Sequence, residues 1–197
     1  PTKPQPYDLQ GGVEDNLIDF TPELRQRARE QLQSMVNGPI YTPPSEQGTV
    51  VVPGPLGGAN WGGAGFDPET GVLYVPSRTT ATVSRLVQGN PTQTNYRYRS
   101  GGGGHLASLL AIDDLPLFKP PYARVTAIDM NKGEHLWMTP LGNGPRRHPL
   151  LKDLDLPPLG DPILGGSVLV TKTLLFVSVT HLFVFGNPQP VPWARWN

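Results

Sequence analysis

Two tight turns of the form Asp-x-x-x-Gly, each lying between short apolar runs, constrain the fold of this chain most strongly. The first turn is 67–71 and leads into the run 72–75, and the second is 129–133 and joins the runs 124–128 and 134–137. In such a turn the Asp side chain caps the backbone, and the Gly accepts a positive φ. Apolar runs on both sides of a turn predict β-hairpins.

A third pair of apolar runs extends this pattern toward the end of the chain. Residues 166–170 and 174–178 flank a short turn at 171–173. The 24 Pro and 23 Gly punctuate these runs, as they do in proteins built from strands and turns. The sequence therefore predicts an all-β fold.

One helix is predicted near the start of the chain. Thr21 suits the N-cap, and Pro22 suits the first helical position. Apolar residues then recur at helical spacing, and the segment 37–39 (Asn-Gly-Pro) stops the helix. We expect a helical insertion over 21–37, after an extended connector over 1–20. The arginines of its outer face indicate a solvated surface, with a binding patch as the alternative; they are Arg25, Arg27 and Arg29.

Composition excludes several kinds of function. Lys plus Arg and Asp plus Glu are both 16, so the zero net charge gives no reason to expect nucleic acid or an anionic membrane as a partner. The chain has no Cys, which excludes disulfides, thiolate metal sites and a Cys nucleophile. The glycine run 101–104 lies in a long loop, 88–122, and lacks the Gly-Lys-Ser/Thr of a phosphate loop.

The second turn carries a motif that resembles a known family. Ala127, Asp129, Gly133 and Trp137 match the pattern Ala-x-Asp-x-x-x-Gly-x-x-x-Trp, which resembles the tryptophan-docking motif of dehydrogenases that depend on pyrroloquinoline quinone (PQQ). Longer segments, in the same order, resemble the membrane-bound quinoprotein glucose dehydrogenases; they are 1–4, 41–48, 52–54, 57–63, 66–68, 73–75 and 164–166. The resemblance covers about residues 1–178.

This resemblance implies a fold and an activity. The chain would be a partial β-propeller, about two to three four-stranded blades of an eight-bladed ring, with its blades in 38–186 and an irregular tail over 187–197. The complete enzyme would oxidise a sugar or alcohol, with a glucose-like substrate, by means of PQQ and calcium. It would pass electrons to ubiquinone or a cytochrome, and it would lie in the periplasm, with an inner-membrane anchor ahead of Pro1 left open.

The same resemblance points to four residues of a cofactor site. Asn60 and Trp61 lie in the glycine-rich segment 57–63, and Gly165 and Gly166 lie in a second such segment. An amide can donate and accept hydrogen bonds, an indole offers a flat face, and glycines let a backbone approach a rigid ligand. The alternatives are that Asn60 satisfies its own turn, that Trp61 packs a blade, and that the two later glycines only form a turn.

No catalytic residue and no metal ligand is assigned in this chain. By resemblance the catalytic base and most ligands of the calcium ion lie upstream of Pro1. The histidines lack ligand spacing, and we interpret them as surface or turn residues; they are His105, His135, His148 and His181. Asp113 and Asp114 suggest a solvated pair more than a paired-carboxylate site.

The family pattern stops near Ser178, where we expect a truncation or a change of reading frame. An arc of a few blades leaves sheet edges and faces uncovered. The isolated chain is therefore expected to bind PQQ weakly or not at all and to have no turnover, because the rest of the ring is required. The alternative function is an inactive propeller module with a structural or binding role.

Overall fold

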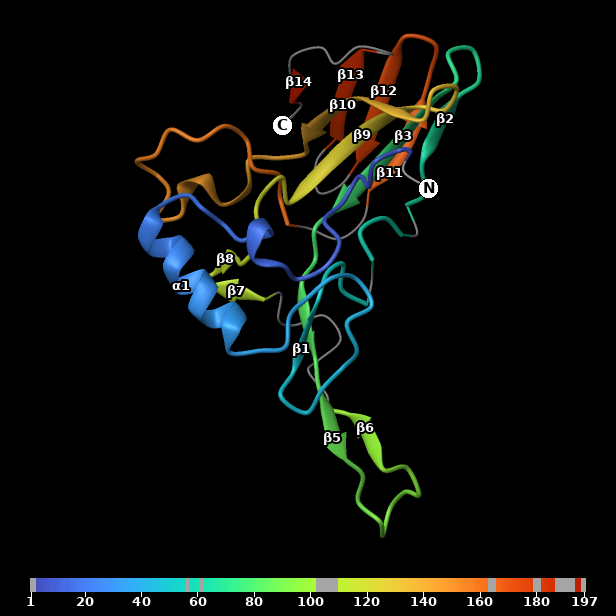
Figure 1. The fold of residues 1–197 in the computed structure, drawn as a ribbon. Helices are drawn as coiled ribbons and strands as arrows, with labels where there is room; N and C mark the ends of the chain where they lie inside the picture. Colours follow the sequence, from blue (N-terminus) through green and yellow to red (C-terminus); the bar gives the residue numbers. More distant parts are fainter. Residues whose placement is uncertain are drawn as a thin grey trace. The chain divides into compact units, whose positions relative to one another are not determined.

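The computed structural model describes residues 3–55, 57–60, 62–101, 110–162, 166–178, 182–186 and 194–195 (Figure 1). The chain divides into two compact units. The first contains Pro1–Asp8, Gly58–Thr79 and Pro120–Asn197, and the second contains Leu9–Gly57 and Thr80–Lys119. Among the described residues, no helix combines the length and the apolar character needed to cross a bilayer.

The first unit holds two antiparallel sheets of four strands each. The first sheet has the order β10-β9-β3-β2, and its strands are β2 (Gly65–Asp67), β3 (Val72–Arg78), β9 (Ala123–Asp129) and β10 (Glu134–Pro140). Both Asp-x-x-x-Gly turns close as the sequence predicts, because the amide of Gly71 donates to the carbonyl of Asp67 at 2.9 Å and that of Gly133 to Asp129 at 2.7 Å.

The second sheet follows the first along the chain, in the order β11-β12-β13-β14. Its strands are β11 (Ser167–Val170), β12 (Leu174–Ser178), β13 (Leu182–Gly186) and β14 (Ala194–Arg195). The expected third hairpin is thus present as β11 and β12. β13 pairs with β12 beyond Ser178, where the family pattern was expected to stop, and β14 lies within the segment 187–197 that was expected to be irregular.

The two sheets share one apolar core. It contains Val72 and Tyr74 of β3, Val125 and Ala127 of β9, and further buried residues of the two sheets and of the loop after β10; these are Ala123, Leu141, Leu175, Val177 and Phe185. Trp137 of β10 packs between the two sheets, with its ring centroid 5.8 Å from that of Tyr74 and 6.3 Å from that of Phe185. The Trp of the docking motif therefore joins neighbouring blades, as the motif predicts.

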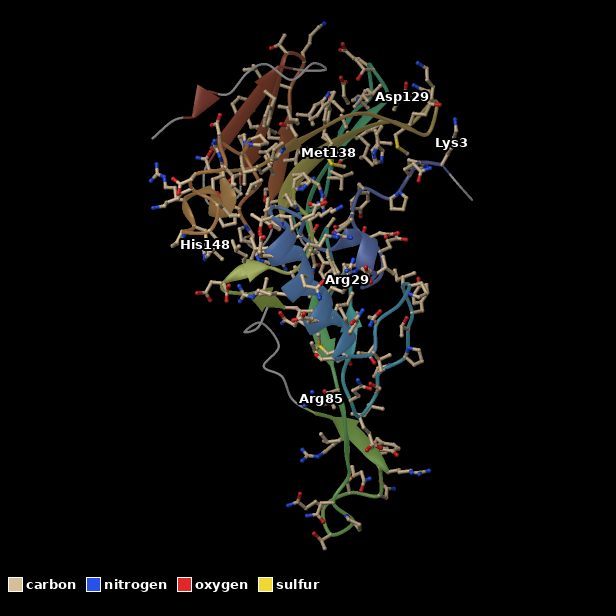
Figure 2. All side chains as sticks on the ribbon, turned by 60° about the vertical axis from the view of Figure 1, so that its left-hand side comes forward. Lys3, Arg29, Arg85, Asp129, Met138 and His148 are labelled. Carbon is tan, nitrogen blue, oxygen red and sulfur yellow. The ribbon has the colours of Figure 1, made fainter. Side chains whose placement is uncertain are left out.

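The N-terminal segment of the first unit lies along the first sheet. Lys3 forms an exposed ion pair with Glu134 of β10 at 2.7 Å, and Figure 2 shows Lys3 near the end of the sheet that carries Asp129. The segment expected as an extended connector over 1–20 thus contacts a strand of this sheet through Lys3.

The second unit holds the helix and several short strand pairs. Its elements are η1 (Glu14–Asn16), α1 (Pro22–Gln33), β1 (Thr49–Val51), β4 (Thr82–Ser84), β5 (Leu86–Gln88), β6 (Tyr98–Ser100), β7 (Ala111–Ile112) and β8 (Leu115–Pro116). α1 buries Leu24, Ala28 and Leu32, the predicted apolar stripe, but ends at Gln33 rather than near residue 37. The loop predicted over 88–122 contains β6, β7 and β8.

The arginines of the outer face of α1 contact the loops around the helix. Arg25 donates to the carbonyls of Leu17 and Glu14, at 3.1 and 3.3 Å. Arg27 pairs with Asp113 at 2.7 Å, and Arg29 pairs with Glu14 at 2.8 Å. These contacts tie α1 to the loops around it, while the three side chains stay partly or fully exposed, as on the predicted solvated face.

Loss of the N-cap of α1 is expected to weaken the second unit. The hydroxyl of Thr21 accepts a hydrogen bond from the amide of Leu24 at 3.2 Å. Thr21→Ala removes this acceptor, and we expect a loss of about 1 kcal/mol in the free energy of unfolding. Thr21→Ser keeps the hydroxyl and serves as the control. Equal urea midpoints for the two variants would contradict the capping role.

The structure and the arrangement of its sheets agree with the predicted fold class. The chain is mostly β-strand with one short α-helix, and two four-stranded meandering sheets pack face to face as successive blades do. The sheets of the described residues form no closed ring. The chain is therefore a partial propeller, with its helix and hairpins inserted before the first blade and between β3 and β9.

Candidate functional site

Residues 58–60 and 62–63 lie in a turn just before β2. The amide of Arg78 donates to the carbonyl of Gly58 at 2.9 Å, and the amide of Gly63 donates to the carbonyl of Asn60 at 2.9 Å. Gly63 has a φ of +66°, which favours glycine at this position. The side chain of Asn60 is exposed on this turn. Trp61 lies outside the described residues.

The two predicted glycine segments meet in the structure. A Cβ atom built on Gly62 would lie 1.5 Å from the carbonyl oxygen of Gly166, so only a residue without a side chain fits there. A Cβ on Gly65, the first residue of β2, would lie 2.6 Å from the side chain of Val168 and 2.5 Å from that of Val170. The structure therefore brings Asn60 and Gly166 to the same end of the two packed sheets. Gly165 lies outside the described residues.

A buried ion pair lies directly against this turn. The side chains of Asp8 and Arg124 form a salt bridge and are 8% and 3% exposed. Thr79 donates its hydroxyl to Asp8 at 2.9 Å, and Arg124 also donates to Ser77 at 3.1 Å. A Cβ on Gly58 would lie 2.0 Å from Oδ2 of Asp8, so the carboxylate occupies the space beside that glycine.

A second arginine shares this buried region. Arg78, the last residue of β3, is 9% exposed. Burial lowers its pKa, while the nearby charge of Asp8 acts in the opposite direction. The pKa of Arg124 is lowered by burial in the same way, again opposed by Asp8. The carboxylate of Asp8 thus acts on the guanidinium groups of both arginines.

Sequence reasoning missed this charged group. Asp8 stands in a Pro-rich segment without periodicity, and its pairing with Arg124 spans 116 residues. One signal was present, because Arg124 begins the predicted strand 124–128, and a charged residue that is buried in a strand needs a partner. Arg78, which follows the apolar run of β3, gives a weaker signal of the same kind.

The other polar candidates do not gather into a site. In the ranges that the structure describes, no three His, Asp or Glu side chains lie close enough together to hold a metal ion. Asp113 pairs with Arg27, and both Asp113 and Asp114 have a positive φ, at 48° and 64°, so they shape a turn. His148 accepts from the amide of Leu150 at 3.3 Å, as a turn residue does, and is labelled in Figure 2. His105 and His181 lie outside the described residues.

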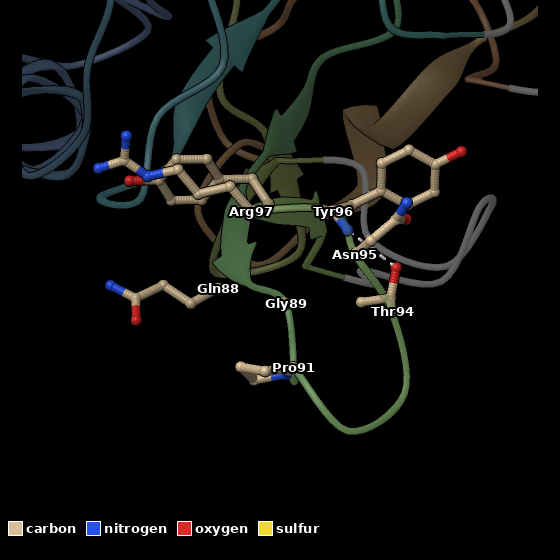
Figure 3. Close-up of a pocket in the computed structure, with 8 residues that line it drawn as sticks. Gln88, Gly89, Pro91, Thr94, Asn95, Tyr96 and Arg97 are labelled. Atoms are coloured by element: carbon tan, nitrogen blue, oxygen red, sulfur yellow. Dashed lines mark hydrogen bonds between the residues drawn. The ribbon is translucent and has the colours of Figure 1, made fainter.

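A separate hollow lies in the hairpin of β5 and β6 in the second unit (Figure 3). Its volume is about 500 Å³, and its lining is Gln88, Gly89, Pro91, Thr94, Asn95, Tyr96, Arg97 and Tyr98. The guanidinium of Arg97 stacks on the ring of Tyr98, at 5.3 Å from its centroid. None of the residues predicted for a site lines this hollow, and Tyr96 is 73% exposed.

Comparison with protein-family models gives one match over most of the chain. The model of the glucose/ethanol/alcohol dehydrogenase β-propeller domain, named PQQ, matches residues 1–185. The match includes the turn at 58–63, the segment around Gly166 and the docking Trp137. It also runs past Ser178 into β13, which agrees with the pairing of β13 and β12.

Proteins with related sequences are named for different substrates. The chain is 29% identical over 198 residues to the quinoprotein glucose dehydrogenase A of Acinetobacter calcoaceticus, covering 91% of this chain and 25% of that protein. It is 27% identical over 185 residues to the quinate/shikimate dehydrogenase (quinone) of Acinetobacter baylyi, covering 85% and 23%. It is 30% identical over 164 residues to the glycerol dehydrogenase large subunit of Gluconobacter oxydans, covering 70% and 22%. The chain thus spans about a quarter of the length of the curated relatives it matches.

Proposed function

Because the chain belongs to the family of PQQ-dependent glucose, ethanol and alcohol dehydrogenases, within their β-propeller domain, we propose that it supplies one arc of a propeller that oxidises a sugar or alcohol. The observation that carries this proposal is the meeting of Gly62 and Gly166 beside Asn60. Two glycine-rich segments from successive blades form one surface there, at the end of the sheets where loops leave the strands.

The residues at this surface fit a flat quinone with polar edges. The close approach of Gly62 and Gly166 packs two glycine-rich backbone segments against each other, and backbone without side chains can come close to a rigid ring. The exposed amide of Asn60 can donate and accept hydrogen bonds at the edge of such a ring. Trp61, next in the chain, would add a flat aromatic wall. The residue types therefore suit PQQ.

Bound PQQ and the residues of this chain would have different roles in the reaction. Bound PQQ would supply the two-electron oxidising power of the reaction. Asn60 would orient the polar edge of the cofactor through its amide, and Gly62, Gly165 and Gly166 would allow close backbone contact that excludes water. The catalytic base and the calcium ligands are proposed to come from other blades of the ring.

The first blade offers a face for another blade to cover. Phe66 of β2 is 52% exposed, and Leu136 and Met138 of β10 are 45% and 41% exposed. Large apolar side chains on one sheet are normally covered by a neighbouring sheet. Their exposure supports the proposal that the rest of the propeller is required for the complete enzyme.

We propose a class of substrate and a class of electron acceptor. The relatives are named for glucose, quinate or shikimate, and glycerol, so we propose a small molecule that carries a CH–OH group, with a glucose-like sugar as the first candidate. Ubiquinone or a cytochrome would accept the electrons. We propose a periplasmic location; the inner-membrane anchor proposed with it would lie ahead of Pro1.

The proposal is tested by PQQ binding to the chain, followed through quenching of its tryptophan fluorescence. We expect weak binding that Asn60→Ala weakens further by about tenfold, because the cofactor loses its amide partner. Asn95→Ala, at an exposed position of the β5–β6 hairpin, is the matched control. Equal affinities for the two variants, or no PQQ binding even when the chain is part of a complete ring, would contradict the proposal.

A measurement of turnover distinguishes the proposed enzyme from the alternative, an inactive module with a structural or binding role. We expect no dye reduction with glucose, PQQ and calcium from the chain alone, because the proposed base lies elsewhere in the ring. Turnover from a complete ring that contains this chain would support the enzyme. PQQ binding without turnover in that complete ring would favour the inactive module.

A further inference from the structure

The β5–β6 hairpin carries a positive charge that the neutral composition of the whole chain conceals. No Asp or Glu lies between Glu69 and Asp113, whereas four of the 16 Lys and Arg residues do. Three of the four lie in the hairpin or directly before it, and all three are exposed; they are Arg85, Arg97 and Arg99. Charge of one sign is therefore concentrated on one small exposed element.

The chain itself does not neutralise these three arginines. Among the described residues, none of them forms an ion pair. Arg99 lies opposite Val87 in the ladder, and Arg85, two residues before Val87, shares that face of the hairpin. Like charges on one face of a strand pair destabilise it, and β5 and β6 pair only with each other. A partner of opposite charge would remove this repulsion.

The hollow of the hairpin offers hydrogen-bond donors for a carboxylate. Its volume is about 500 Å³, its lining includes the side chains of Gln88, Asn95 and Arg97, and no acidic residue lines it. Arg97 stacks on the ring of Tyr98, at 5.3 Å from the ring centroid (Figure 3). A guanidinium stacked in this way presents its N–H groups at its edge, where a carboxylate can accept two parallel hydrogen bonds.

The residue types of the hairpin favour a protein as the partner over a lipid surface. Arg and Tyr are enriched in protein interfaces and Lys is depleted there, and the hairpin contains no Lys. Segments that lie on membranes insert Trp, Phe or Leu side chains. Within 85–101, the one large apolar side chain that is exposed is Tyr96, at 73%. Arginine and tyrosine without an apolar anchor therefore indicate an acidic protein surface.

We propose that the β5–β6 hairpin binds an acidic segment of another protein. Asp or Glu side chains of that segment would pair with Arg97 and Arg99, and one of them would enter the hollow beside Gln88 and Asn95. Opposite charges on two protein surfaces speed their encounter and select the partner. This proposal does not depend on PQQ binding, because it rests only on residues of the hairpin.

The test titrates the chain with a synthetic Glu-rich peptide and with the same peptide carrying Gln in place of Glu. The side-chain Nε–Hε signals of Arg97 and Arg99, followed by ¹⁵N NMR, should shift with the Glu peptide alone, and high salt should weaken the binding. The double variant Arg97→Gln with Arg99→Gln should bind the Glu peptide about tenfold more weakly. The variant Arg97→Lys with Arg99→Lys keeps the charge and should lose less.

A matched control separates the hairpin from the net charge of the chain. Arg146→Gln with Arg147→Gln removes the same charge from two neighbouring residues of the first unit and should leave the affinity for the Glu peptide nearly unchanged. A loss equal to that of the hairpin variant would show that the peptide senses net charge only, and it would overturn the proposal. Equal binding of the Glu and Gln peptides would do the same.

Two further measurements test the choice of partner. Vesicles that contain phosphatidylglycerol should bind the chain no more weakly after Arg97→Gln with Arg99→Gln; a tenfold loss for vesicles but not for the Glu peptide would assign the hairpin to a membrane. The Glu peptide should also bind a complete ring that contains this chain. Binding to the chain but not to that ring would show that another blade covers the hairpin, and the proposal would fail.

Discussion

Gly62→Ala is expected to destabilise the first unit by about 3 kcal/mol and to abolish measurable PQQ binding. The added methyl group would lie 1.5 Å from the carbonyl oxygen of Gly166, and a backbone oxygen cannot rotate away as a flexible side chain can. The two sheets must therefore separate at this end, which also moves the proposed cofactor surface. Urea unfolding and fluorescence titration with PQQ measure the two effects.

Gly63→Ala is the matched control for this substitution. A Cβ atom on Gly63 meets nothing within 4 Å, but the φ of +66° strains any residue other than glycine. We expect a cost of about 1 kcal/mol and a smaller effect on PQQ binding. If Gly63→Ala were as damaging as Gly62→Ala in both measurements, the contact between the two glycine segments would not be what holds the surface together.

Breaking the buried ion pair is the second large effect. Asp8→Ala and Arg124→Ala are each expected to lower the free energy of unfolding by about 3–5 kcal/mol, because each leaves one buried charge without its partner. The double variant Asp8→Leu with Arg124→Met removes both charges and should recover most of that loss. Since Asp8 also fills the space beside Gly58, single variants should weaken PQQ binding as well.

An exposed ion pair provides the control for this prediction. Lys172 and Glu69 lie 3.8 Å apart with side chains 80% and 68% exposed, so water screens their interaction. Glu69→Gln should leave the urea midpoint unchanged. Single variants of Asp8 and Arg124 that behaved like Glu69→Gln, or losses that simply added in the double variant, would show that the buried pair contributes little.

Local chemistry made the hairpins and the helix predictable. The turns at 67–71 and 129–133 depend on an Asp and a Gly a few residues apart, and α1 begins at a Thr cap followed by Pro22, so nearby residues carry the information. The end of α1 was predicted too late, because Met35 continues the apolar spacing although the helix stops at Gln33.

Contacts between residues far apart in the sequence could not be predicted from local sequence patterns. The pairing of Asp8 with Arg124 depends on how β9 and the N-terminal segment meet, and nothing near either residue indicates the other. The contact of Gly62 with Gly166 is similar, although the family resemblance placed both segments near one cofactor. Of the four residues proposed for that cofactor, the structure describes Asn60 and Gly166 and brings their segments together. Their contact with PQQ, and that of Trp61 and Gly165, stays a prediction.

The most direct test is amide hydrogen exchange of the chain with and without saturating PQQ, resolved by peptide. A cofactor held between two glycine-rich segments must slow exchange in both at once, so the peptides that cover 57–66 and 160–170 should gain protection together. Protection confined to the β5–β6 hairpin, or to only one of those two peptides, would show that no quinone surface is built from them.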